Sequence, residues 1–182
     1  QGGHDGRSGH RAPQHLGGAW LSHTLDYRNF YTARIPAVNR HGLHSCLFKQ
    51  LLVGFLLADG WLEKHGQGAR LGISLTERFQ DVAQWYLVLL YGMGYTDRLS
   101  LGAPLGRSKP NSKPYYQLRT FSFASLLVFY EQWYRTDKTK RVKCLPDHVV
   151  LYQMLTPFVL SVWIMGDGSG MRDGGFKIST HS

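Results

Sequence analysis

Two apolar stretches of one design decide the fold: residues 52–60 read LVGFLLADG and residues 160–168 read LSVWIMGDG. In each, a single aspartate, Asp59 or Asp167, stands in the last turn of a predicted apolar helix, directly before a glycine. The C-terminal end of a helix carries partial negative charge, which disfavours an anion there by roughly 0.3–1 kcal/mol. Two such aspartates indicate a shared purpose, although the alternative is a pair of ordinary Asp-Gly turns.

Small residues in both stretches favour close packing of the two helices. Gly54 and Ala58 lie four residues apart, as do Val162 and Gly166, and this spacing lets helix backbones approach closely. We therefore expect these four residues to form a helix interface that brings the two carboxylates together. Two carboxylates about 5 Å apart repel by roughly 3 kcal/mol at an effective dielectric of about 20. A divalent cation such as Mg²⁺ relieves that repulsion and can assist in-line hydrolysis of a phosphodiester.

Hydrophobic periodicity outside the two stretches predicts alternating helices and strands. The order is helix, two strands, helix, two strands, helix, followed by a second pass that ends after its early strands. We expect a tail at 1–18, a strand at 70–75, a helix capped by Thr76 and running to Met93, strands at 98–101 and 115–121, a helix capped by Ser122, a basic connector at 135–143, a helix capped by Thr156 with Pro157 in its first turn, and a last strand at 176–179.

The composition favours a globular chain with a polyanionic partner. Of 182 residues, 43% are hydrophobic and 18% charged, which is typical neither of a disordered chain nor of a membrane protein. Lysine and arginine total 21 against 12 acids, a net charge of +9, and nucleic acid is the commonest partner of such a protein. The two cysteines are too few for a disulfide-rich scaffold and lack the spacing of a metal site.

The two stretches resemble the motif of the LAGLIDADG homing endonuclease family. The first matches it at Leu52, Gly54, Ala58, Asp59 and Gly60, whereas Leu57 stands where the name has its first Asp. The second resembles a branch of the family at Leu155-Thr156-Pro157, Leu160, Trp163, Met165 and Gly166-Asp167-Gly168-Ser169, with Gly166 in place of the first Asp. Segments 119–123 and 145–146 are also similar to the family, and the resemblance covers residues 48–182.

The resemblance implies a mixed α/β (α+β) saddle built from αββαββα repeats related by a pseudo-two-fold axis. The divisions expected are an N-terminal segment at 1–46 that is flexible or unassigned, a first repeat at 47–134, a basic linker at 135–152, and the start of an incomplete second repeat at 153–182. The motif helices would form the central interface of a monomer. Asp59 and Asp167 would bind Mg²⁺ or another divalent cation such as Mn²⁺.

The same resemblance implies a site-specific DNA endonuclease that drives intron homing. Such proteins are encoded within introns or inteins, often in mitochondria or chloroplasts. Two alternatives stay open, both compatible with this fold. One is a maturase that binds intron RNA and assists splicing, and the other is a degenerate nucleic-acid-binding fragment without catalysis.

Basic and hydrogen-bonding side chains on the predicted strands favour DNA binding. Residues 98–119 contain no acid, and in a curved sheet arginine can pair with guanine and glutamine with adenine. The lysines of the basic run would contact phosphates, and one of them could stabilise charge at the scissile phosphate. A solvated strand face and a soluble linker are the alternatives. The expected DNA-binding residues are Arg70, Ser74, Arg98, Arg107, Lys109, Lys113, Tyr115, Gln117, Arg119, Lys140, Lys143, Lys177 and Ser179.

Overall fold

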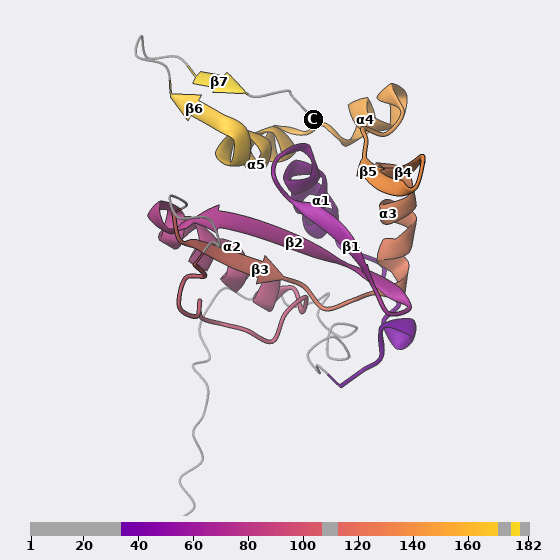
Figure 1. Ribbon diagram of the computed structural model, residues 1–182, viewed down its shortest axis with the longest axis horizontal. Helices are drawn as coiled ribbons and strands as arrows, with labels where there is room; N and C mark the ends of the chain where they lie inside the picture. The colour runs from indigo at the N-terminus through magenta and orange to yellow at the C-terminus, as the bar shows by residue number, and fades with distance from the viewer. Residues whose placement is uncertain (1–33, 107–112, 171–175, 179–182) are drawn as a thin grey trace, which may run out of the picture.

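The structure is a computed structural model that describes residues 34–106, 113–170 and 176–178 (Figure 1). The predicted tail at 1–18 lies outside these residues. The described elements are η2 (Ala37–Asn39), α1 (Cys46–Leu57), β1 (Trp61–His65), β2 (Gly68–Thr76), η3 (Glu77–Phe79), α2 (Gln80–Gly92), β3 (Tyr115–Arg119), η4 (Ala124–Leu126), α3 (Leu127–Trp133), β4 (Tyr134–Asp137), β5 (Lys140–Lys143), α4 (His148–Met154), α5 (Pro157–Asp167), β6 (Gly168–Gly170) and β7 (Phe176–Ile178).

The predicted α+β fold is confirmed: helices pack against one side of an antiparallel sheet with the strand order β1-β2-β3. Alternation along β2 buries Leu71 and Ile73, and Leu118 of β3 joins them on the same face. Helix α1 supplies much of the opposing core. In Figure 1, α5 lies beside α1, and the hairpin β6–β7 continues from the end of α5.

Local sequence explains where α1 begins and ends. Ser45 caps the helix, because its hydroxyl oxygen accepts a hydrogen bond from the Phe48 amide at 3.1 Å. At the other end, the Gly60 amide donates to the Phe55 carbonyl at 2.8 Å. A Cβ at Gly60 would lie 2.6 Å from that carbonyl oxygen, so the turn has no room for a side chain. The helix thus ends at Leu57, and Asp59 follows the helix instead of standing in its last turn as expected.

The strand expected at 98–101 does not form. The side chain of Gln84 in α2 takes up its backbone groups: Nε2 donates to the Leu99 carbonyl at 2.8 Å, and Oε1 accepts from the Leu101 amide at 3.1 Å. Strand β3 instead makes an isolated bridge between Tyr115 and Leu105. A side chain distant in sequence thus replaces the predicted strand partner.

Two of the three expected helix caps are also wrong. Thr76 closes β2 and makes no side-chain cap bond to η3, while the Ser122 hydroxyl contacts His65 Nδ1 at 2.9 Å. The cap at Thr156 is confirmed, because its hydroxyl oxygen accepts from the Val159 amide at 3.2 Å. Of these three hydroxyl groups, only that of Thr156 accepts a hydrogen bond from the first turn of its helix.

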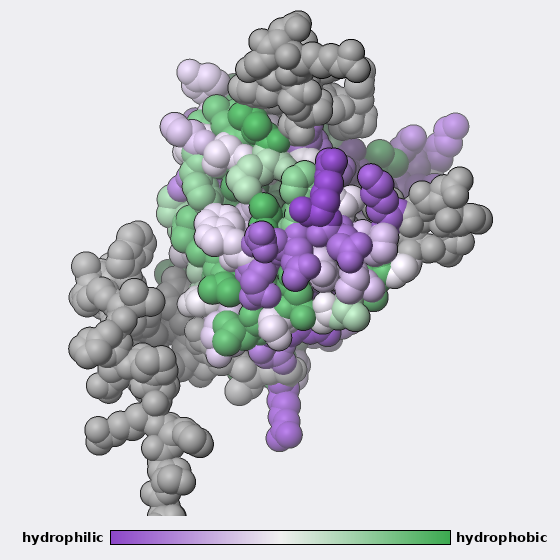
Figure 2. All heavy atoms as spheres, turned by 90° about the vertical axis from the view of Figure 1, so that its left-hand side faces the viewer, coloured by the Kyte–Doolittle hydropathy of each residue, from purple (hydrophilic) through white to green (hydrophobic). Residues whose placement is uncertain are grey.

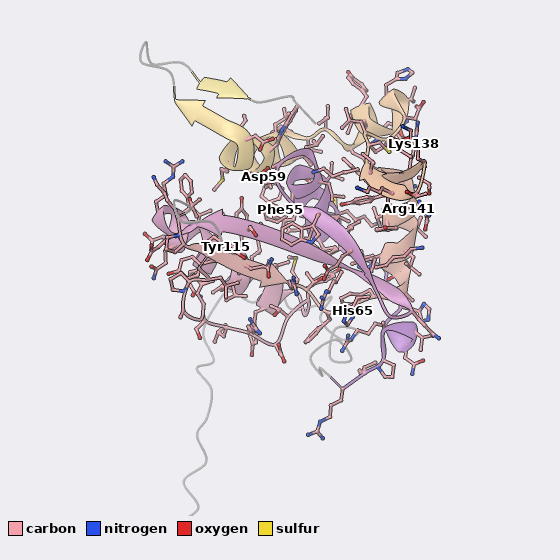
Figure 3. The ribbon with its side chains drawn as sticks, in the orientation of Figure 1. Phe55, Asp59, His65, Tyr115, Lys138 and Arg141 are labelled. Atoms are coloured by element: carbon pink, nitrogen blue, oxygen red, sulfur yellow. The ribbon has the colours of Figure 1, made fainter. Side chains whose placement is uncertain are left out.

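The basic segment at 135–143, expected as a connector, forms most of the hairpin β4–β5. Lys138 sits in its turn with a φ of 52°, and Asp137 pairs with Lys140 across it. This pairing leaves a two-residue loop, the tightest common hairpin connection. Figure 3 shows Lys138 and Arg141 on this hairpin, beside α3. The basic run is therefore a formed structural element.

No single helix among the described residues is long and apolar enough to cross a membrane, and α4 with α5 reaches the required length only as a pair bent by 100°.

Candidate functional site

The site is organised by the contact between α1 and α5. A Cβ added to Gly54 would lie 2.6 Å from Val162 Cβ, and one added to Gly166 would lie 2.5 Å from Ala58 Cβ. Gly54 and Val162 each stand five residues before their motif aspartate, and Ala58 and Gly166 each stand one residue before it. Each residue therefore faces its own counterpart, which is the contact pattern of a two-fold axis between the helices.

This axis brings the two aspartates to one end of the helix pair. Burial raises the pKa of the Asp167 carboxyl, and the charge of Asp59 raises it further. The Trp163 indole N–H opposes that rise by donating to Asp167 Oδ2 at 3.3 Å. Figure 3 shows Asp59 at the end of α1. The two carboxylates therefore lie within electrostatic reach of each other.

Lys143, at the C-terminal end of β5, lies beside the two aspartates, and we refer to Asp59, Asp167 and Lys143 as the acidic cluster. Its Nζ donates to the carbonyls of Ala58 at 2.9 Å and Gly60 at 3.1 Å, which flank Asp59 in sequence. Burial lowers the pKa of Lys143, while the charges of Asp59 and Asp167 act in the opposite direction. An ammonium has three N–H donors, so two on carbonyls leave a third for another acceptor.

Beside the acids, a cavity of about 440 Å³ opens between α1, α5 and the end of β2. Its lining includes Asp59, Ser74, Arg78 and the partly exposed apolar side chains of Phe79 and Met165. Figure 2 shows this side of the molecule, where hydrophobic and hydrophilic side chains lie next to one another. Asp59 is thus open to solvent on the cavity side, while Asp167 and Lys143 are half-buried behind it.

The donor set fits a hard divalent cation held by few protein ligands. Among the described residues, no group of three or more His, Cys, Asp or Glu side chains could enclose a metal ion. Two carboxylates alone suit Mg²⁺, which keeps several waters and binds substrate phosphates in the remaining positions. Burial and the charge of Asp59 raise the pKa of Asp167, and a cation bound there would offset the contribution of Asp59.

The face of the sheet opposite the core carries several of the predicted DNA-binding residues. Gly72 pairs with Arg119, Ser74 with Gln117 and Thr76 with Tyr115. Paired residues of an antiparallel sheet project to the same side, so these rows share one face. Arg119 is exposed, and Figure 3 shows Tyr115 near the beginning of β3. Trp61 lies in the row of Gly72, and Glu63 and Arg70 form the next row. We refer to this surface, with these three residues, as the outer sheet face.

The other predicted residues are more scattered. Arg98 lies in the loop after α2 and shares a small hollow of about 90 Å³ with Arg119, while Lys113 precedes β3 and Lys140 lies on the β4–β5 hairpin. Lys177 pairs through its backbone with Ser169 in β6–β7. Arg107, Lys109 and Ser179 fall outside the described residues.

Two residues of the outer sheet face were missed by sequence reasoning. The indole of Trp61 covers Gly72 so closely that a Cβ there would lie 2.4 Å from Trp61 Cε2. Glu63, on the same strand, pairs with Arg70. Alternation along 61–65 was the only available signal, and the strand partner could not be known before the register.

Comparison with known proteins places these features in context. The sequence model described as the LAGLIDADG DNA endonuclease family matches residues 49–182. The chain is 25% identical over 175 residues to the cytochrome b mRNA maturase bI2 of Saccharomyces cerevisiae, covering 88% of this chain and 40% of that protein. The fold is similar to that of the homing endonuclease I-WcaI, solved bound to its DNA recognition sequence, with a TM-score of 0.51 and 15% identity over 69% of this chain and 53% of that chain. The chain thus spans about half, or less, of the length of these relatives.

Proposed function

Because this chain belongs to the LAGLIDADG DNA endonuclease family, we propose that it is a site-specific endonuclease that hydrolyses phosphodiester bonds in both strands of a DNA target. The observation that carries the proposal is the contact between equivalent residues of α1 and α5, with an aspartate at each helix end and Lys143 beside them. A lone Asp-Gly turn would need neither a matched partner nor a lysine. With a divalent cation between the two carboxylates, the cluster would carry the positive charge that a phosphodiester substrate requires.

In this proposal, Asp59 and Asp167 hold a divalent cation, Mg²⁺ or Mn²⁺, through their carboxylate oxygens. Such a cation, when bound, supplies Lewis-acid activation of the phosphate and of an attacking water. Two carbonyls keep the Lys143 side chain in place, and its remaining N–H would donate to the charge that develops on the phosphate. The burial that lowers the pKa of Lys143 also strengthens its interaction with a negative oxygen.

The outer sheet face serves, in the same proposal, as the surface that reads the DNA. Arg119 and Gln117 stand in neighbouring rows of β3, and their side chains match guanine and adenine in the major groove. The exposed lysines of the β4–β5 hairpin contact phosphates, which predicts an affinity that falls steeply with salt.

The test is cutting of a plasmid that carries the intronless insertion site, in the presence of Mg²⁺. Wild type is expected to linearise the plasmid, and Asp59→Asn and Asp167→Asn are each expected to lose the activity. Asp81→Asn, an exposed acid in the first turn of α2, is the matched control and should cut normally. Equal cutting by all four proteins would contradict the assigned roles. DNA binding without cutting by wild type would favour the degenerate, non-catalytic alternative.

A second candidate function, assistance in splicing intron RNA, is supported by the similarity to a yeast mRNA maturase. A maturase needs the basic surfaces for RNA but not the two carboxylates. Splicing of the parent intron that survives both Asp→Asn substitutions would therefore favour this function. For either function, we propose from the family resemblance that the chain is encoded in an organellar intron, in a mitochondrion or chloroplast. We also propose that it acts as a monomer with pseudo-two-fold halves.

A further inference from the structure

An acid stands among the basic and polar side chains of the outer sheet face. Glu63 of β1 lies directly opposite Arg70 of β2 in the strand register, and its Oε1 accepts a hydrogen bond from Arg70 Nε. Both side chains are partly exposed, at 31% for Glu63 and 22% for Arg70. On a surface that faces a polyanion, a carboxylate opposes binding unless it meets a donor on the nucleic acid.

The ion pair leaves most of its hydrogen-bonding capacity free. Only Nε of Arg70 and Oε1 of Glu63 take part in it. Nη1 and Nη2 of Arg70 and Oε2 of Glu63 have no partner among the described residues. The pair therefore offers two donor nitrogens, with four N–H groups between them, and one acceptor oxygen side by side. In the neighbouring row of the same face, the Trp61 indole lies over Gly72.

A G·C base pair presents the complementary order in the major groove. Guanine N7 and O6 are acceptors, and the cytosine N4 amino group beside them is a donor. An A·T pair places a donor, adenine N6, next to the N7 acceptor, and offers no amino group at the position of cytosine N4. Arginine suits the guanine edge, and a carboxylate suits cytosine N4.

We propose that Glu63 and Arg70 together read one G·C base pair of a DNA target, with Arg70 Nη1 and Nη2 donating to guanine and Glu63 Oε2 accepting from cytosine N4. Arg70 thereby gains a partner that orients its guanidinium before DNA arrives, and Glu63 becomes a specificity-determining residue. This inference rests on the proposed DNA-binding function and goes beyond it by naming the base pair and the acid that selects it.

The experiment is selection from a library of DNA duplexes of random sequence, carried out with the whole chain in EDTA so that binding is read without cutting. Wild type is expected to enrich a motif that contains one G·C position sensitive to both residues. Arg70→Ala and Glu63→Ala should each lower the preference at that position by about tenfold. Glu63→Gln keeps the size of the side chain and should lose the cytosine preference as well, because an amide donates as well as accepts.

Glu131→Ala is the matched control. Glu131 is also an acid in ion pairs, with Lys64 and Arg141, but it belongs to α3 on the other side of the sheet and should leave every position of the motif unchanged. The inference is overturned if Glu63→Ala raises affinity for all sequences equally, which would make the acid a mere repulsive charge. It is also overturned if Glu63→Ala and Arg70→Ala change different positions. Failure of wild type to enrich any sequence would instead overturn the proposed function, and this inference with it.

Discussion

The two motif helices, α1 and α5, have the same design in sequence and very different surroundings in the structure. Helix α1 has seven buried residues, all between Phe48 and Leu56, whereas α5 has only two, Val159 and Val162. Leu52 is fully buried, but Leu160, at the equivalent motif position, is 38% exposed. Apolar composition therefore makes both segments helical, while burial is decided by the elements packed around each.

This difference separates two roles of one motif. Helix α1 shares a hydrophobic core with residues of the sheet, α2 and α3. Helix α5 packs on α1 along one side and leaves Leu160 and Met165 exposed. The contact between the helices is the part that both share. Substitutions at equivalent positions should therefore have unequal effects away from the contact and coupled effects within it.

The largest expected effect comes from truncating the equivalent leucines. Leu52→Ala removes a fully buried side chain from the core, which should lower the free energy of unfolding by about 2–5 kcal/mol. Leu160→Ala should cost less than about 1 kcal/mol because the side chain is already partly in water. Urea denaturation followed by circular dichroism measures both. Equal losses would mean that α5 is as enclosed as α1, contrary to the comparison.

The second-largest expected effect comes from a substitution at the contact between α1 and α5. Gly54→Ala introduces a Cβ within 2.6 Å of Val162 Cβ and 3.1 Å of the Val159 carbonyl, so we expect a loss of about 1–3 kcal/mol in the free energy of unfolding. Gly92→Ala at the end of α2 is the control: a Cβ there meets nothing within 4 Å, and the change should be neutral or slightly stabilising.

A double substitution separates overpacking from other effects of Gly54→Ala. Val162→Gly removes the atoms that the new Cβ would strike, so Gly54→Ala combined with Val162→Gly should cost less than the sum of the two single changes. Strict additivity in the same denaturation experiment would show that the helices do not meet at these residues.

Much of the fold could be predicted from local sequence. Alternation identified the strand around Leu71 and Ile73, and the run of apolar residues identified both motif helices, because these patterns depend only on which face is buried. The strand at 98–101 was wrong because the Gln84 side chain, from a preceding helix, takes its backbone hydrogen bonds. A bond of that kind leaves no periodic trace in the sequence.

The candidate site divides in the same way. The aspartates and the small residues could be identified as candidate site residues from the sequence, because the motif that contains them occurs twice, at 52–60 and 160–168. The neighbours of these residues could not, because they depend on register and tertiary packing. Glu63 meets Arg70 only through the pairing of β1 with β2. Lys143 reaches the carbonyls of Ala58 and Gly60 only because β5 ends beside α1.

The entry into α1 provides a third test, through pH. His44, one residue before the Ser45 cap, is buried, and its ring nitrogens contact Tyr95 Oη and Ser125 Oγ, each at 2.8 Å. Burial, and to a lesser degree the charge of Lys49, lowers the pKa of His44 from 6.5 to about 4. A lowered pKa in the folded state means that protonation favours unfolding, so this stability is present above pH 6.5 and is lost as the pH falls toward 4.

Between pH 6.5 and pH 5, this group should remove about 1.5 kcal/mol from the free energy of unfolding. His44→Gln cannot titrate, so the variant should show a pH dependence that is shallower by this amount in urea denaturation at the two pH values. His148, which is exposed, provides the control substitution and should leave the slope as in wild type. Parallel slopes for wild type and His44→Gln would mean that His44 is not held neutral.

The smallest effect concerns the caps, where the two helices are most alike. Ser45 and Thr156 each accept a hydrogen bond from the amide three residues on, and replacing either by alanine should cost about 1 kcal/mol in urea denaturation. Thr156 also donates to Gln50 Oε1 of α1 at 2.7 Å, so it ties the start of α5 to its partner helix. Thr156→Ala should therefore cost at least as much as Ser45→Ala, although α5 is the more exposed helix. Thr139→Ala in the exposed turn of β4–β5 should cost nothing measurable. A neutral Thr156→Ala would show that α5 is held against α1 by the contact at Gly54 and Gly166 alone, and not at its N-terminus.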